Sequence, residues 1–268
     1  MLKISGVDIS TAVPEEKIRQ NIVDARTYCV KPISLLDDWR EGRSIAVIGG
    51  GPSLSSYLKE IKGYVNAIAC GSVHDYLIKN RVYPSHTLIC DPDPIMGDYL
   101  REYSNSKYLI ASQCDKSVFQ LLSNRDCYIW NSVGPHEFNQ EMFGGYENCI
   151  PGGCTVGTRA ILCAIGMGYK KIHLYGMDSC LDEKDNHHCY PFENPKLEDI
   201  GPITEIRLDA PSNKTFKVAG YMMAQVFDFQ KILEQYAGVL EIEVFGNGVL
   251  AEIMRLGRLK AQELKKDI

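Results

Sequence analysis

Seven short apolar runs, separated by stretches with helical spacing, limit the architectures that this chain can adopt. The runs are IAVIG (45–49), VNAIAC (65–70), HTLIC (86–90), YLIAS (108–112), CYIW (127–130), KIHLYG (171–176) and LEIEVF (240–245). They are nearly continuously apolar, which is typical of strands covered on both faces of a parallel sheet. The lengths between them suit right-handed helical crossovers. We therefore predict an α/β fold with a doubly wound, mostly parallel, Rossmann-like sheet.

The regions outside these runs define the predicted domain organisation. Pro14, followed by two glutamates, marks the start of a helix over 14–29. The polar stretch that follows the sixth run is weakly periodic and long for a simple connection, so we predict a lid there, followed by a helix over 217–236. The predicted units are an N-terminal helical extension (1–43), the sheet domain (44–248) with its lid at about 181–213, and a C-terminal amphipathic helix (249–268).

Composition excludes several partners and locations. The net charge is −5 and the pI about 5.7, so no basic excess is available for a nucleic-acid backbone. No apolar run approaches the roughly 20 residues of a membrane span, and no signal peptide is evident. The ten cysteines are scattered without a CxxC pair, which favours buried free thiols in a reducing compartment. We expect a cytoplasmic protein with small-molecule partners, and a homo-oligomer is compatible with the sequence.

Small or polar residues follow most of the runs, at the edge of the predicted sheet where ligands bind. A sheet needs turns, but it does not need small or polar groups at nearly every carboxyl end. We therefore expect these residues to form one site. They are Gly49, Gly50, Gly51, Pro52 and Ser53, then Gly71, Ser72 and His74, Asp91 and Asp93, Ser112 and Gln113, Asn131 and Ser132, and Gly176, Asp178 and Ser179.

The loop 49–53 is the strongest candidate for nucleotide binding. Its glycines allow close approach to the backbone, and a helix opening near Ser53, with Ser53 as its cap, would favour a phosphate. Leu54 stands where a dinucleotide fingerprint requires a third glycine, and no Lys-Ser/Thr pair of P-loop type is present. We predict a nucleotide loop that follows neither standard motif. A tight turn without a ligand is the alternative.

Two other positions carry carboxylates at predicted strand ends. Asp91 and Asp93 alternate with prolines that restrict the backbone, and paired carboxylates beside phosphates suit Mg²⁺. We predict them as metal ligands, with an Asp-Pro turn as the alternative. Asp178 follows a strand and a glycine. It is predicted to contact a ribose hydroxyl, a metal or an acceptor, with a capping aspartate as the alternative.

A second glycine-containing segment precedes the predicted helix 156–167. Its backbone N–H groups and a hydroxyl suit an anion, and a plain helix cap is the alternative. The segment consists of Gly152, Gly153, Cys154 and Thr155. A nucleophilic role for Cys154 is a further alternative, because a helix N-terminus lowers a thiol pKa.

The lid stretch contains His187 and His188. A histidine there could act as a general acid or base, or pair with a phosphate, and we assign that role to His188. The alternatives are exposed histidines without function, or a zinc site shared with Cys180 and Cys189.

Together these segments resemble a known family. IAVIGGGPSLSS, then ICDPDP, then GGCTVGTRAILCAIGMGYKKIHLYGMDS are similar to the MptE-like family. That family includes archaeal 6-hydroxymethylpterin diphosphokinases and motility accessory factors of flagellin glycosylation. The layout also resembles family 42 sialyltransferases, which use CMP-sialic acid on a Rossmann-like sheet. The resemblance covers residues 44–179.

The resemblance implies roles for particular residues. Gly49, Gly51, Pro52 and Ser53 match the donor-nucleotide loop, Ser112 and Gln113 the nucleoside contacts, Thr155 a donor segment, and His188, before Tyr190, the lid histidine. The archaeal diphosphokinases carry Asp-Leu-Asp-Gly where this chain has Asp-Pro-Asp-Pro at 91–94, so the pattern departs from the pterin enzymes there.

Three functions follow as expectations. The first is a glycosyltransferase that holds a nucleotide-activated, CMP-type sugar across the Gly49 and Gly152 segments, under a lid carrying His188. The second is Mg²⁺-dependent diphosphate transfer from ATP to a hydroxymethylpterin-like acceptor, with Asp91 and Asp93 holding the metal. The third is a non-catalytic nucleotide-binding module, because a fold alone does not establish catalysis.

Overall fold

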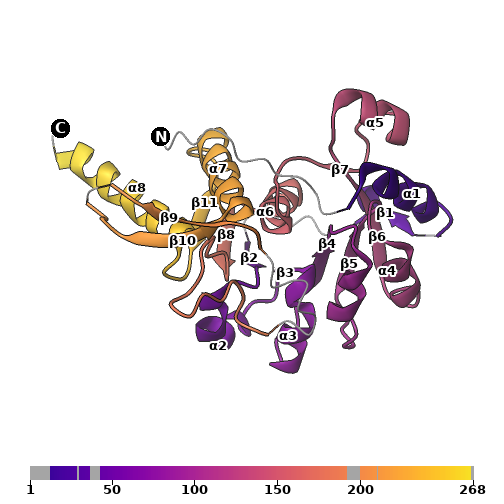
Figure 1. Ribbon diagram of the computed structural model, residues 1–268, viewed down its shortest axis with the longest axis horizontal. Helices are drawn as coiled ribbons and strands as arrows, with labels where there is room; N and C mark the ends of the chain where they lie inside the picture. Colours follow the sequence, from indigo (N-terminus) through magenta and orange to yellow (C-terminus); the bar gives the residue numbers. More distant parts are fainter. Residues whose placement is uncertain (1–12, 29, 37–42, 192–199, 210, 267–268) are drawn as a thin grey trace.

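A nine-stranded sheet organises the computed structural model, which describes residues 13–28, 30–36, 43–191, 200–209 and 211–266. The strands run in the order β1-β6-β5-β4-β3-β2-β8-β11, with β7 paired to β6, and every neighbouring pair is parallel. Helices α6 and α7 lie on one side of this sheet and α2 and α3 on the other (Figure 1). The predicted doubly wound α/β fold is confirmed.

The element bounds are as follows. The strands of the large sheet are β1 (Lys31–Pro32), β2 (Ser44–Ile48), β3 (Ala67–Cys70), β4 (His86–Ile89), β5 (Lys107–Ala111), β6 (Cys127–Ser132), β7 (Cys149–Ile150), β8 (Lys171–Tyr175) and β11 (Glu241–Val244). A separate antiparallel hairpin consists of β9 (Ile203–Arg207) and β10 (Thr215–Ala219). The helices are α1 (Glu15–Ala25), α2 (Leu58–Ile61), α3 (His74–Lys79), α4 (Lys116–Leu121), α5 (His136–Phe143), α6 (Val156–Gly166), α7 (Gly220–Gln235) and α8 (Val249–Lys266).

Each of the seven apolar runs forms a strand of the large sheet. In β2, the side chains from Ile45 to Ile48 are completely buried, as continuous apolar character requires of a strand covered on both faces. The short strands β1 and β7 were not predicted, because two residues carry no periodic signal. Of the cysteines in the described residues, every one is a free thiol, as expected.

The strand order places a topological switch point between β2 and β8. From β2 the chain builds outward through β3, β4, β5 and β6, and then α6 crosses back so that β8 pairs with the opposite side of β2. The last residues of the two strands, Ile48 and Tyr175, are register partners. The loops that follow them therefore diverge from one point, which is where ligands bind in open α/β sheets.

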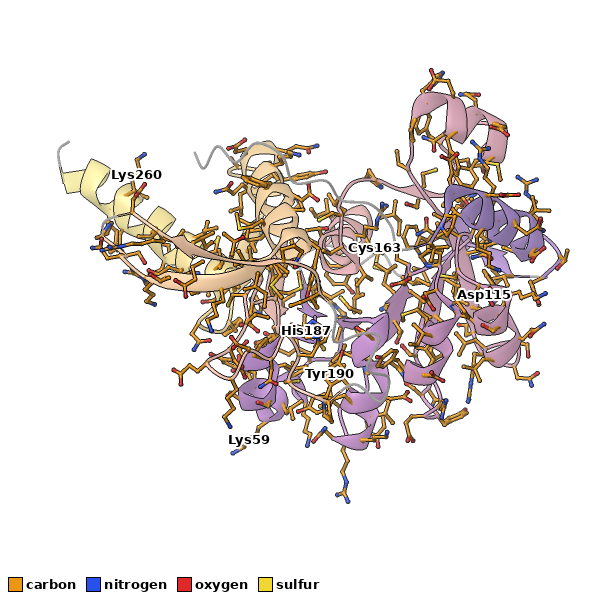
Figure 2. All side chains as sticks on the ribbon, viewed as in Figure 1. Lys59, Asp115, Cys163, His187, Tyr190 and Lys260 are labelled. Carbon is orange, nitrogen blue, oxygen red and sulfur yellow. The ribbon has the colours of Figure 1, made fainter. Side chains whose placement is uncertain are left out.

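Helix α1 covers another part of the same sheet edge. The Asn21 carboxamide donates to the carbonyls of Pro92 (3.2 Å) and Gln113 (2.9 Å), beyond β4 and β5. Lys17 forms an ion pair with Asp115 at 2.9 Å, at the end of the molecule labelled Asp115 in Figure 2. The predicted leading helix is thus present, and it begins after Pro14. Its predicted last residue, Cys29, lies outside the described residues.

The helix predicted over 217–236 starts later than expected. Residues 215–219 pair instead with β9, and α7 begins at Gly220. Residues 215–219 form a strand because they pair with β9, in spite of their helical pattern. The periodicity of a single segment does not reveal such a pairing partner. The polar stretch predicted as a lid therefore contains part of a hairpin. Its residues 192–199 and 210 lie outside the described residues.

The hairpin is attached to α8, beside which it lies at one end of the molecule (Figure 1). Glu252 of α8 is only 3% exposed and accepts hydrogen bonds from Arg255 Nε (3.0 Å), Lys214 Nζ (2.8 Å) and Ser212 Oγ (2.5 Å). These partners, with Arg255 first, lower the pKa of Glu252 from 4.5 to about 2.

We expect Glu252→Gln to lower the free energy of unfolding at pH 7 by about 2 kcal/mol, a value reduced because the cationic partners are half-exposed. A depressed carboxyl pKa contributes stability above pH 4.5, and that stability is lost as the pH falls through about 2. Urea unfolding of both proteins at several pH values would measure this, and the difference between their free energies of unfolding should shrink as the pH falls from 4.5 to about 2. A difference that does not shrink would contradict the role of Glu252, and Glu137→Gln on the exposed face of α5 is the control.

No described helix is both long enough and apolar enough to cross a membrane.

Candidate functional site

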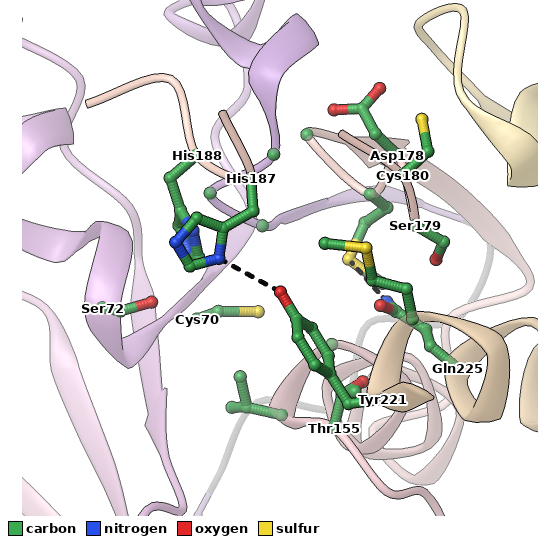
Figure 3. A pocket seen from close by; sticks show the side chains of 18 residues that line it. Cys70, Ser72, Thr155, Asp178, Ser179, Cys180, His187, His188, Tyr221 and Gln225 are labelled. Atoms are coloured by element: carbon green, nitrogen blue, oxygen red, sulfur yellow. Dashed lines mark hydrogen bonds between the residues drawn. The ribbon is translucent and has the colours of Figure 1, made fainter. Parts of the chain in front are cut away.

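A cavity of about 130 Å³ lies at the switch point, and its lining is drawn in Figure 3. The loops after β2 and β8 form one part of it, and the starts of α6 and α7 form another. Residues 187–190, which we call the strap, pass over the β2 loop. The lining residues are Gly49, Gly50, Gly51, Cys70, Ser72, Thr155, Val156, Gly157, Gly176, Met177, Asp178, Ser179, Cys180, His187, His188, Tyr221, Met222 and Gln225.

The cavity brings together predicted residues from several segments. They are Gly49, Gly50, Gly51, Ser72, Thr155, Gly176, Asp178, Ser179, His187 and His188. The other predicted residues do not line it, including both aspartates proposed as metal ligands. The cavity therefore includes fewer strand ends than predicted, because it lies at the switch point and does not extend along the whole edge of the sheet.

The glycines of the β2 loop are required by close packing within the protein. A Cβ on Gly49 would lie 2.5 Å from the Gly176 carbonyl oxygen, and one on Gly51 would collide with the Asp178 carboxylate. On Gly50 it would lie 2.5 Å from both His188 Cδ2 and the Tyr190 hydroxyl. Other groups thus approach the backbone of this loop closely, as its glycines predicted, and in this structure those groups are parts of the protein itself.

The predicted helix start at Ser53 is wrong in its details. A short 3₁₀ helix, Pro52–Tyr57, follows Gly51, and the Ser53 side chain does not cap it. The Ser53 N–H donates instead to Asp178 Oδ2 at 3.0 Å, and the Gly51 N–H donates to the Gly176 carbonyl at 2.8 Å. Amides expected to receive a phosphate are therefore already engaged. Burial raises the pKa of the Asp178 carboxyl above its usual range, despite the hydrogen bonds from Ser53.

The second predicted anion cradle is also occupied by a carboxylate. The Cys154 N–H donates to Asp228 Oδ2 of α7 at 2.8 Å, and Thr155 caps α6 by accepting from the Thr158 N–H at 3.3 Å. Gly152 and Gly153 take left-handed conformations in the approach to this cap. Burial, followed by Asp228, raises the pKa of the Cys154 thiol to about 12, which argues against the nucleophile alternative.

The strap holds two histidines over the β2 loop. The Cys189 N–H donates to the Gly50 carbonyl (3.0 Å), and His187 Nδ1 lies 3.2 Å from the Tyr221 hydroxyl. Tyr190 contacts the ring of Tyr76, with centroids 5.2 Å apart. His187 and His188, the former labelled in Figure 2, are half-buried, so the alternative of exposed histidines is wrong. Burial, followed by His187, lowers the pKa of His188 to about 3, so its ring is neutral at neutral pH.

Asp91 and Asp93 form turns at the end of β4. Asp91 Oδ1 accepts from the Asp93 N–H and Asp93 Oδ1 accepts from the Ile95 N–H, each at 2.9 Å. This is the bonding expected for the Asp-Pro turn that was the alternative to a metal site. In the part of the chain that the structure describes, no group of three or more His, Cys, Asp or Glu side chains is placed to hold a metal, which also leaves the zinc alternative without support.

Four further predicted residues serve the sheet edge outside the cavity. Gln113 donates to the Cys90 carbonyl at 2.7 Å and so connects β4 to β5. Asn131 donates to the Glu147 carbonyl at 3.3 Å. Gly71 packs against Met96, and Ser112 is buried at the end of β5.

Sequence reasoning missed the contribution of α7 to the cavity. Tyr221 and Gln225 lie four residues apart on α7, so both face the cavity (Figure 3). Cys70, the last residue of β3, lines it as well. A glutamine on the buried face of a helix that is otherwise apolar there is the signal that could have pointed to α7.

Comparisons with known proteins agree with this architecture. The family model described as "6-hydroxymethylpterin diphosphokinase MptE-like" matches residues 18–184, more than half of the 268-residue chain. Among solved structures, the MAf glycosyltransferase from Magnetospirillum magneticum AMB-1 is similar with a TM-score of 0.65 and 15% identity, over 90% of this chain and 38% of that one. The present chain therefore spans well under half the length of that protein.

Two sialyltransferases are similar at lower scores. CstII from Campylobacter jejuni, in complex with cytidine-5'-monophosphate, has a TM-score of 0.45 and 15% identity over 80% of this chain and 84% of that one. A mammalian sialyltransferase has a TM-score of 0.47 and 12% identity over 90% and 88%. No curated protein matched the sequence.

Proposed function

The chain belongs to the MptE-like family, and on that premise we propose that it is a nucleotide-dependent transferase whose donor binds in the cavity between β2 and β8. The position of the cavity at the topological switch point supports this, because open α/β sheets bind their ligands there. The fold shared with the MAf glycosyltransferase supports transfer of a sugar from a nucleotide-activated donor.

The charge of the lining is the observation that carries the choice of donor. Among the 18 described residues around the cavity, none is lysine or arginine, and the carboxylate of Asp178 is present. Transfer from ATP brings several negatively charged phosphate groups into the site, and metal ions and basic side chains must neutralise them. A CMP-type donor carries a single phosphodiester charge, so it needs far less neutralisation. We therefore favour a CMP-type sugar donor.

Diphosphate transfer from ATP to a hydroxymethylpterin-like acceptor is the second candidate, favoured by the description of the matching family. It needs Mg²⁺, for which the sequence offered Asp91 and Asp93. One oxygen of each carboxylate already accepts a backbone N–H, and neither residue lines the cavity. These residues fit a metal at the donor phosphates poorly.

Admission of a nucleotide requires the strap to move. Ligand pockets usually enclose about 300–1,000 Å³, and the cavity beneath the strap measures only about 130 Å³. The hydrogen bond between His187 and Tyr221 and the contact of Cys189 with Gly50 would break on opening and form again over the donor. Reclosure would exclude water from the sugar–phosphate bond, which protects an activated donor from hydrolysis.

His188 is the proposed catalytic residue, and Asp178 a positioning residue. His188 packs on Gly50, beside the place where the donor phosphate would enter. A phosphate there raises the pKa of a neighbouring histidine. The protonated ring would then stabilise the nucleotide phosphate as its bond to the sugar breaks. Asp178 holds the Ser53 N–H and so fixes the shape of the β2 loop.

We expect CMP, without metal, to raise the melting temperature of the protein. A ligand at 100 times its Kd adds about 2.7 kcal/mol, which corresponds to roughly 5–10 °C for a chain of this size. Differential scanning fluorimetry with CMP, cytidine, inorganic phosphate, and ATP with and without Mg²⁺ measures this. Stabilisation by ATP only in the presence of Mg²⁺ would favour the diphosphokinase candidate, and no shift with any nucleotide would refute both.

A further inference from the structure

The turn that follows β8 holds a non-glycine residue in a left-handed conformation. Ser179 has a φ of 53°, and it lies three residues after Gly176, whose φ is 60°. A side chain at such a φ is strained, and the conformation persists only where the surroundings impose it. Strained residues of this kind gather at functional sites, so the contacts of this turn and the direction of its hydroxyl matter.

Two separate segments, the β2 loop and the start of α8, impose the conformation. The Gly176 carbonyl accepts from the Gly51 N–H, and the Asp178 carboxylate accepts from the Ser53 N–H. On the other side, the Val249 N–H at the start of α8 donates to the Asp178 carbonyl at 2.8 Å. Gly248 is packed so closely that a Cβ there would collide with the Asp178 backbone. Ser179 is thus placed by the β2 loop and by α8 together.

The hydroxyl of Ser179, a residue that lines the cavity, has no hydrogen-bond partner among the described residues. Ser179 is 6% exposed and lines the cavity, and its Oγ is buried. An unsatisfied buried hydroxyl is costly and rare in native proteins, so it calls for an explanation. Gln225 stands on the same cavity wall, 8% exposed, and its Nε2 contacts the Met177 sulfur at 3.6 Å (Figure 3). A thioether is a weak acceptor, so the carboxamide also has hydrogen-bonding capacity to spare.

We propose that Ser179 Oγ and the Gln225 carboxamide bind the ribose hydroxyls of the nucleotide, an inference that rests on the proposed function. Both groups are neutral and can donate and accept, which matches a pair of hydroxyls. The residue that the sequence predicted for ribose contact, Asp178, uses its carboxylate on the Ser53 N–H. The contact therefore shifts to the next residue in the chain.

Deoxynucleotides test this directly. Isothermal titration calorimetry would compare CMP with 2′-deoxy-CMP and 3′-deoxy-CMP, and the AMP series would be run in parallel. A site built to bond a hydroxyl rejects the analogue that lacks it. We expect the wild-type protein to bind at least one deoxy form about 10-fold more weakly, and Ser179→Ala to reduce that ratio to about 1 by weakening the ribonucleotide alone. Gln225→Met, which keeps the length of the side chain, should weaken the ribonucleotide as well.

Two further variants serve as a second test and as a control. Ser179→Gly also removes the hydroxyl and relieves the left-handed backbone, so it should lose the same discrimination even if Ser179→Ala folds poorly. Ser117→Ala removes another buried hydroxyl, on α4 and outside the cavity, and should keep the wild-type ratio. Wild-type binding without discrimination, or discrimination retained in both Ser179 variants, would overturn the inference and leave the proposed function standing. Failure of the wild-type protein to bind any nucleotide would overturn both.

Discussion

Replacing Gly176 by alanine is expected to lower the free energy of unfolding by about 2–5 kcal/mol, a large part of the total stability of a typical domain. Two costs add at this position. Its φ of 60° is strained for any residue with a side chain, at about 1–2 kcal/mol. The new Cβ would also collide with the Gly49 carbonyl oxygen and approach Leu54 Cβ at 3.0 Å. The Gly49 carbonyl belongs to the backbone at the end of a buried strand. The collision can be relieved only if β2 and β8 separate, which costs about a further 1–3 kcal/mol.

Gly144→Ala provides the matched control for this prediction. Gly144 ends α5 with a φ of 70°, and nothing lies within 4 Å of the position of its added Cβ. The control therefore carries the backbone strain without the close approach and should cost about 1 kcal/mol. Urea unfolding followed by circular dichroism measures both. Equal losses in the two variants would show that the close contact between the β2 and β8 loops contributes nothing to stability.

Replacing His188 by alanine is expected to slow transfer by 100-fold or more, the usual contribution of a positioned acid or base. Release of CMP from a CMP-activated sugar would measure the rate. The affinity for CMP at neutral pH should change by only a few-fold, because the Gly49 loop and the α7 wall remain. Removal of His136, an exposed histidine on α5 whose Nδ1 contacts the Tyr146 hydroxyl, is the matched control. Full activity of His188→Ala would eliminate the proposed role.

The same residue predicts that CMP binding takes up protons. In the free protein the pKa of His188 is lowered to about 3 by burial, followed by His187. A phosphate beside the ring raises that pKa, so the complex holds more protons than the free protein, and affinity falls as the pH rises through the pKa of the complex. Calorimetry at pH 6 in two buffers of different ionisation enthalpy would measure the uptake. Equal uptake by wild type and His188→Ala would assign the proton to another group.

Much of the fold was readable from short segments. The burial of strands such as 45–49 and 171–176 could be predicted from their residues alone, because a strand covered on both faces is apolar nearly throughout. The carboxyl ends of those strands were identifiable for the same reason, and with them the Gly49 loop and Asp178. The pairing of 215–219 with β9 was not readable, since either segment alone carries too little pattern to identify a partner.

The sequence by itself determined the parallel sheet, its order of strands and helices along the chain, and the glycine loop at the end of β2, because each depends on neighbouring residues. Only the tertiary structure decided which groups meet at that loop. Asp178 on the Ser53 amide and Asp228 on the Cys154 amide are contacts between residues 125 and 74 positions apart. Chain folding brings such groups together through strand order and helix crossing, so their partners and the cavity they enclose are properties of the packed sheet rather than of any segment.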